Sequence, residues 1–72
     1  MPVIDLIGTG KNIKEKMDYK GVTVKYLANV LGFASPNAVY KWLKGETLPT
    51  LDNLLIVATV LGFTMDDLIV KK

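Results

Sequence analysis

The chain has 72 residues, of which half are hydrophobic, and its nine basic residues, all lysines, leave a formal net charge of +2. This length predicts one small domain with a core of marginal stability, and the apolar content excludes a disordered chain. Because cysteine and histidine are both absent, disulfides, thiol chemistry and the usual zinc sites are excluded.

The predicted elements are one arm followed by five helices. Apolar and polar residues alternate only briefly near the start, so residues 1–8 are expected to form an extended N-terminal arm. Apolar residues at helical spacing then predict an all-α domain at residues 9–70. Its helices are expected at 10–20, 24–31, 36–44, 51–61 and 65–70. Each helix follows a hydroxyl residue suited to cap it, namely Thr9, Thr23, Ser35, Thr50 and Thr64.

The second and third predicted helices are short and separated by a glycine turn. Gly32 falls where the chain must leave the second helix, and Ser35-Pro36 is typical of a helix start. Helical spacing in the third helix buries four residues, Ala38, Val39, Trp42 and Leu43. It exposes four others, Asn37, Tyr40, Lys41 and Lys44. Their amide, phenol and ammonium groups can contact DNA bases and phosphates, although a plain helical hairpin with a solvated face remains an alternative.

The charge is distributed unevenly along the chain. Residues 11–44 carry seven lysines against two acids, a net charge of +5, whereas residues 45–72 carry two lysines against four acids, a net charge of −2. The basic half coincides with the two short helices, as expected for a surface that binds DNA. Because arginine is absent, Lys41 is the best remaining donor to guanine.

Membrane insertion, secretion and catalysis find little support in the sequence. The longest apolar run, residues 54–63, is interrupted and too short to span a bilayer. No basic segment followed by a long apolar stretch opens the chain, so a secretory signal is not indicated. Ser35 is the only serine, and no histidine or cysteine could activate it. We therefore expect a cytoplasmic protein that is not an enzyme and holds no metal or cofactor.

Landmark residues recur along about two thirds of the chain at a familiar spacing. They are Leu27-Ala28, Gly32, Val39, Trp42, Gly45, Pro49, Leu51, Leu54, Ala58, Leu61-Gly62 and Leu68. On these residues, the stretch 22–70 resembles the lambda-repressor-like, Cro-type helix-turn-helix family, with one extra residue in the turn at 33–35. The pattern YKWxxGxxLPTxDNL is similar to small regulators of Gram-positive bacteria and their phages.

The resemblance implies a five-helix transcriptional regulator of the phage Cro or repressor type. Such a protein binds operator DNA as a homodimer, with the third helix in the major groove. The residues expected nearest the bases are Ser35, Asn37, Tyr40 and Lys41. Those expected at phosphates are Thr23, Lys25, Lys44 and Thr47.

Several positions depart from the family pattern. Val24 replaces a glutamine that in the family often holds a phosphate and braces the recognition helix, and the loop after that helix carries Glu46 where the family is often basic. Met17 and Leu43 replace an arginine–glutamate pair of several members. We expect these two apolar side chains to touch, because a hydrophobic contact can replace an ion pair at no cost in stability.

The fourth predicted helix carries more apolar residues than one core stripe requires. Leu55 and Ile56 project about 100° and 200° away from Leu54, so we expect both at an interface with another protein. The family commonly dimerises through this part of the fold. An alternative is a small modulator or antirepressor that binds a partner repressor. A third possibility, an antitoxin, would need more than a short N-terminal arm.

Overall fold

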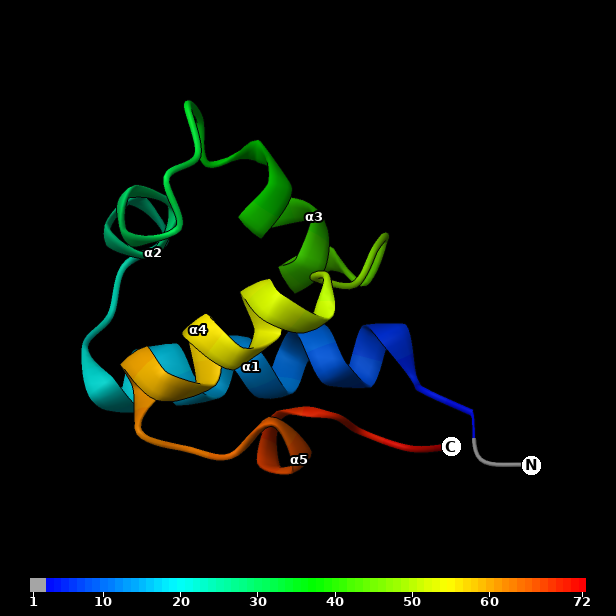
Figure 1. Ribbon diagram of the computed structural model, residues 1–72. Helices are drawn as coiled ribbons and strands as arrows, with labels where there is room; N and C mark the ends of the chain where they lie inside the picture. The colour runs from blue at the N-terminus through cyan, green and yellow to red at the C-terminus, as the bar shows by residue number, and fades with distance from the viewer. Residues whose placement is uncertain (1–2) are drawn as a thin grey trace.

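Five α-helices make up most of residues 3–72, the part of the chain that the computed structural model describes, and they confirm the predicted all-α class. They are α1 (Leu6–Lys20), α2 (Val24–Val30), α3 (Asn37–Lys44), α4 (Leu51–Leu61) and α5 (Met65–Leu68). The helix α1 crosses the middle of the molecule, with α2 and α3 above it and α5 below it in Figure 1. No helix within residues 3–72 is long and apolar enough to cross a membrane.

One apolar core joins all five helices. Its buried side chains are Ile13, Met17, Leu27, Ala28, Val39, Trp42, Leu54, Val57, Ala58, Leu61 and Leu68. Burial of each large side chain contributes about 1.5–3 kcal/mol to folding. The apolar stripe that helical spacing predicts on α4, Leu54, Val57, Ala58 and Leu61, is buried as expected. The predicted burial of Trp42 is also confirmed, since it is only 5% exposed. Met17 is buried and Leu43 is half-buried against the same core, while their direct contact stays a prediction.

The first helix begins earlier than predicted. Asp5, not Thr9, is its N-cap, and the Asp5 carboxylate accepts a hydrogen bond from the backbone N–H of Gly8 at 3.0 Å. The expectation of an extended arm is therefore wrong from Leu6 onward. It applies to residues 3–5, while Met1 and Pro2 lie outside the described residues.

Tertiary contacts explain why the glycines near this end do not prevent the helix. Glycine inside a helix costs about 1 kcal/mol relative to alanine, so Gly8 and Gly10 weaken the first turns of α1 on local grounds. At Gly10, however, α1 crosses α3 so closely that a Cβ atom would lie 2.7 Å from the Leu43 carbonyl oxygen. Thr9 is buried inside the helix, where its hydroxyl oxygen accepts a hydrogen bond from the Val70 N–H at 2.9 Å.

The last helix is shorter than predicted because the chain after it pairs with the N-terminal segment. The helix α5 ends at Leu68, not Val70, and an antiparallel bridge joins Ile4 to Lys71. The Asp5 N–H donates to the Val70 carbonyl at 2.8 Å. The predicted cap of α5 is confirmed, since Thr64 forms reciprocal hydrogen bonds with Asp67.

The two short helices start and end within one residue of their predicted bounds. Thr23 caps α2, as predicted, and accepts the N–H of Tyr26 at 3.1 Å. The helix α3 begins at Asn37 because Pro36 occupies its cap position. Ser35 still supports this end, since its hydroxyl oxygen accepts the Asn37 N–H at 3.3 Å. The bounds predicted for α4 are confirmed, although the Thr50 hydroxyl donates to the Asp52 carboxylate and caps no backbone N–H.

Candidate nucleic-acid interface

The outer face of α3 carries the polar residues that the sequence placed there. Its inner side is fixed against the core by Val39 and Trp42. Its outer side exposes Asn37, Tyr40, Lys41 and Lys44. Together with Glu46, these four line an open hollow of about 560 Å³. The structure thus brings three of the four predicted base-contacting residues, and one predicted phosphate-contacting lysine, onto one continuous surface.

The end of α3 sets the position of the acidic residue on this surface. Gly45 adopts φ +78°, and its N–H and that of Glu46 donate to carbonyls of the last helical turn at 3.1 and 3.0 Å. A Cβ atom at Gly45 would also lie 2.7 Å from the Ile7 Cα, so only glycine fits without movement of α1. Glu46 and Thr47 follow directly after the helix and both are exposed, and Glu46 lies beside the polar face, since it lines the same hollow.

The remaining predicted contact residues lie at the edge between α2 and the turn that leads to α3. Thr23, Lys25 and Ser35 are all exposed and line a second hollow, of about 580 Å³. Sequence analysis missed two further polar residues of this hollow, Tyr26 and Asn29. Helical spacing could have identified Asn29, because this residue follows Lys25 by one helical turn and therefore lies on the same face of α2.

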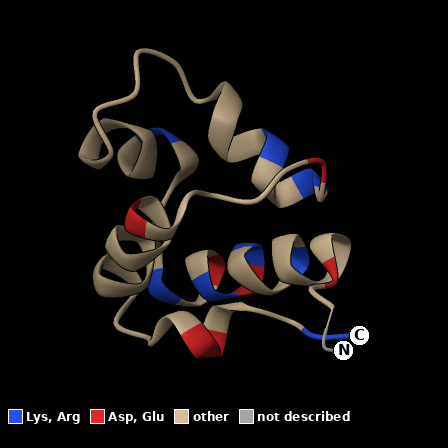
Figure 2. Ribbon diagram, turned by 45° about the vertical axis from the view of Figure 1, so that its right-hand side comes forward, with Lys and Arg blue, Asp and Glu red and all other residues tan. Residues whose placement is uncertain are grey.

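The lysines are less concentrated on α2 and α3 than the sequence suggested (Figure 2). Four of the seven lysines in residues 11–44 lie on α1. There, Lys14 pairs with Asp18 at 2.7 Å, and the ammonium groups of Lys16 and Lys20 lie 5.0 and 5.4 Å from the centre of the Phe63 ring. The cations on α2 and α3 are Lys25, Lys41 and Lys44, and none of them forms an ion pair within the described residues.

Two carboxylates have perturbed pKa values, and hydrogen bonds at the starts of α4 and α5 explain both. The Asp67 pKa is lowered chiefly by the hydrogen bond from the Thr64 N–H, then by the Thr64 hydroxyl and the charge of Lys16. The Asp52 pKa is lowered chiefly by the Thr50 hydroxyl. Within residues 3–72, no cluster of three or more acidic, histidine or cysteine side chains could hold a metal ion. Both acids are therefore explained as structural groups at helix starts.

A different kind of surface lies on α4 and the loop before it. Leu55 is 53% exposed and Ile56 is 37% exposed, so both point away from the core as predicted. Sequence analysis missed Leu51, which is 74% exposed and lies one turn before Leu55 on the same face. An apolar hollow of about 230 Å³ adjoins it, lined by Ile4, Thr9, Leu48, Pro49, Leu51, Leu54 and Ile69.

Two short helices, a glycine turn between them and a polar outer face on the second define a helix-turn-helix protein. The sequence profile of the helix-turn-helix family matches residues 13–68. The chain belongs to this family, which confirms the resemblance found in the sequence. No curated protein sequence matches the chain.

Solved structures share the fold. The chain is similar to the restriction-modification controller protein C.AhdI from Aeromonas hydrophila, with 28% identity, a TM-score of 0.78, and coverage of 89% of this chain and 96% of that one. It is also similar to the clp gene regulator ClgR from Corynebacterium glutamicum, with 24% identity, a TM-score of 0.77, and coverage of 86% and 65%.

One structural relative is an enzyme. The hydroxypropylphosphonic acid epoxidase from S. wedmorenis shares 28% identity, with a TM-score of 0.80, over 92% of this chain. The match covers only 35% of the epoxidase chain. Because the same fold occurs in a regulator and within an enzyme, the fold alone does not determine the function. The function must be inferred from the surface residues.

Proposed function

We propose that this protein is a DNA-binding transcriptional regulator of the phage or phage-like Cro and repressor type. Membership of the helix-turn-helix family and the likeness to a restriction-modification controller support DNA binding. The observation that carries the proposal is the outer face of α3, where amide, phenol and ammonium groups are exposed side by side. Its action on DNA would place the protein in the cytoplasm.

In this proposal, α3 enters the major groove of double-stranded operator DNA. An α-helix with its side chains is about 10–12 Å in diameter, and the major groove is about 12 Å wide, so α3 can lie in the groove. Asn37 would donate to and accept from adenine, and Lys41 would donate to guanine. Ser35 and Tyr40 would contact neighbouring bases.

Phosphate contacts would flank α3 on both sides. Lys44 and Thr47 lie at its C-terminal end, and Thr23 and Lys25 lie at the start of α2. These contacts would orient the protein on the duplex without selecting a sequence. Each lysine that neutralises a phosphate releases counterions, so binding would weaken as the salt concentration rises.

We further propose that two copies bind together through the exposed apolar face of α4. One small domain contacts only one half-site, and a two-fold dimer places the second recognition helix about 34 Å away, one turn of DNA. Leu51, Leu55 and Ile56 offer the apolar area for such a contact. Exposed apolar residues in a contiguous patch are typical of protein interfaces.

A second candidate is a small modulator that binds a partner repressor. The exposed carboxylate of Glu46 favours it, because this group shares the hollow on α3 with Lys41 and Lys44 and would repel DNA phosphates. The apolar face of α4 would then bind the partner instead of a second copy.

Mobility shift on the DNA upstream of the protein's own gene, combined with sedimentation at micromolar concentration, tests these proposals. The regulator hypothesis predicts a dimer and a sequence-dependent shift that weakens with salt, whereas a scrambled duplex of equal length is bound weakly. A monomer that shifts no DNA at low salt would contradict the regulator. The same experiment repeated with the neighbouring regulator present would then test the modulator.

A further inference from the structure

The large aliphatic side chains that remain exposed within residues 3–72 come almost entirely from two segments. Residues 3–7 contribute Val3, Ile4 and Ile7, and residues 48–56 contribute Leu48, Leu51, Leu55 and Ile56. Only one other large aliphatic residue of the described chain is exposed, Val30 on α2. Single exposed apolar residues need no explanation, whereas a concentration of this kind is typical of a binding surface.

The apolar hollow of about 230 Å³ joins the two segments into one surface. Ile4 lines it from the N-terminal segment, and Leu48 and Leu51 line it from the loop before α4 and from the first turn of α4. Among its described lining residues, Thr9 alone has a polar side chain. The Thr9 hydroxyl is already engaged, since it accepts the Val70 N–H at 2.9 Å and lies 3.5 Å from the Val70 carbonyl oxygen. The hollow therefore offers apolar contact and no free hydrogen-bonding side chain.

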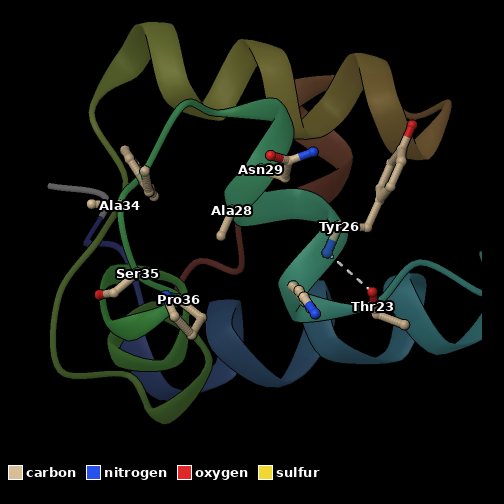
Figure 3. A pocket seen from close by; sticks show the side chains of 9 residues that line it. Thr23, Tyr26, Ala28, Asn29, Ala34, Ser35 and Pro36 are labelled. Carbon is tan, nitrogen blue, oxygen red and sulfur yellow. Dashed lines mark hydrogen bonds between the residues drawn. The ribbon is translucent and has the colours of Figure 1, made fainter.

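The hollow beside α2 is of a different kind. Figure 3 shows the polar side chains of Thr23, Asn29 and Ser35 around it, and Lys25 also lines it. Hydroxyl, amide and ammonium groups suit the phosphates of DNA, whereas leucine and isoleucine do not. The two hollows therefore suit different partners, and the apolar one suits the surface of a protein.

The apolar surface carries both halves of a contact with a second copy of itself. Leu55 follows Leu51 by one helical turn, so Leu55 projects beside the hollow that Leu51 lines. A cavity of about 150 Å³ can hold benzene, so the larger hollow here can accept one aliphatic side chain. A two-fold interface needs this self-complementarity, because the same patch faces itself. The described lining residues carry no charge, so like charges do not meet in the hollow.

We propose that a second copy of this chain covers the apolar surface, and that Leu55 of each copy enters the hollow formed by Ile4, Leu48 and Leu51 of the other copy. The N-terminal segment is then part of the dimer interface together with α4. The loop that contains Leu48 begins at the end of α3, so this contact would also fix the two recognition helices relative to each other. The inference rests on the proposed dimer and assigns the residues outside α4 that complete its interface.

Sedimentation of variants outside α4 tests the role of these residues. We expect Ile4→Lys and Leu48→Lys each to raise the Kd of the dimer about 100-fold or more, because two-fold symmetry removes the same aliphatic contact twice. Val30→Lys is the matched control, since Val30 is 42% exposed on α2 and lies outside the surface. Melting curves show which variants stay folded, and Leu48→Lys decides the outcome if Ile4→Lys unfolds.

A mixture of two variants tests whether the contact joins two copies. We expect Ile4→Lys chains and Leu55→Glu chains each to be monomeric alone and to form a mixed dimer when combined. In that dimer one lysine faces one glutamate, and the other contact keeps its native residues. Leu55→Lys in place of Leu55→Glu is the control, because two lysines would then face each other and the mixed dimer should not form.

The outcomes separate this inference from the proposed function. If Ile4→Lys and Leu48→Lys remain dimers as tight as the wild type, the inference is wrong and a dimer through α4 alone stands. A monomeric wild type overturns both. If that monomer binds the neighbouring regulator and Ile4→Lys abolishes this binding, the surface belongs to a different partner and the inference is again wrong. A dimer that behaves as expected but shifts no DNA would contradict the regulator and support the inference.

Discussion

The helices α3 and α4 are alike on their buried sides and opposite on their exposed sides. Both end at a glycine with positive φ, Gly45 in α3 and Gly62 in α4, and both contribute buried apolar side chains to the one core. The outer face of α3, however, carries amide, phenol and ammonium groups, whereas that of α4 carries leucine and isoleucine.

This difference separates what folding requires from what binding requires. A lysine or asparagine in water is well solvated, so the outer face of α3 costs the monomer little. Leu51 and Leu55 remain more than half exposed, and each Å² of apolar area that a partner covers would contribute about 25 cal/mol. The buried halves of the two helices therefore follow from the fold, whereas their exposed halves carry the contacts that we propose with DNA and with a second copy.

The largest effect should follow from charging the outer face of α4. We expect the double variant Leu55→Lys, Ile56→Lys to stay folded, because both side chains are already exposed, and to sediment as a monomer. Loss of the linked second half-site should weaken operator binding about 10²–10⁴-fold. Tyr19→Lys, which adds a charge on α1, serves as the control. If the double variant still forms the dimer, this face of α4 is not the dimer interface.

Truncation of the shared core should affect stability, not partner choice. Met17→Ala is expected to lower the free energy of unfolding by about 2–5 kcal/mol, since Met17 is only 2% exposed. A denaturant titration of Met17→Ala, Leu43→Ala and the double variant should show a coupling of at least about 0.5 kcal/mol. Strictly additive values would mean that the two side chains do not touch.

Removal of the amide from the outer face of α3 should change sequence preference. We expect Asn37→Ala to cost about 1–3 kcal/mol of operator binding and to relax the preference at one base pair. Binding to duplexes with each base pair substituted in turn measures this loss. An equal loss on every duplex would assign Asn37 to the backbone.

A smaller effect is expected from Lys44, at the end of α3. Lys44→Ala should weaken all sequences alike and reduce the slope of log affinity against log salt by about 0.9. The comparison with Asn37→Ala is made at several salt concentrations. If neither variant changes affinity or slope, α3 does not contact DNA.

The smallest effect concerns the start of α4, where Asp52 lies in the first turn. The Thr50 hydroxyl, then nearby backbone N–H groups, hold the pKa of Asp52 below its ordinary value of 3.8. The folded chain therefore binds this proton less tightly than the unfolded chain. The resulting stability is present above about pH 3.8 and is lost as the pH falls through the folded pKa. Asp52→Asn should reduce this acid sensitivity slightly in melting curves, with Asp66→Asn as the control.

The sequence predicted the middle of the fold better than its ends. The bounds of α4 were correct because its apolar stripe, Thr50 and Gly62 all agree on them. The start of α1 was missed because the brief alternation of apolar and polar residues suggested an extended arm and Thr9 suggested a cap, whereas packing of Gly10 on α3 and of Thr9 on Val70 extends the helix. Such contacts join segments far apart in sequence, and local patterns do not reveal them.

The candidate site was predictable where it depends on a single helix. Helical spacing was enough to place Asn37, Tyr40 and Lys41 together. The hollow with Tyr26 and Asn29 was not found, because it forms only when the turn folds beside α2. The contact of Lys16 and Lys20 with Phe63 also depends on tertiary structure, whereas the Lys14–Asp18 pair lies within α1. Both weaken the inference that was drawn from the charge distribution along the chain.

The pairing between Val3 and Lys72 makes the fold easy to embed in a longer polypeptide. These two residues are joined by a backbone hydrogen bond of 2.8 Å, on the side of α1 away from α3 (Figure 1). An insertion that enters and leaves a host protein at one point needs ends this close together. A similar fold makes up about a third of the epoxidase chain. A fluorescent protein or second domain joined at this point would leave the fold below α1 in the view of Figure 1, whereas α3 lies above α1.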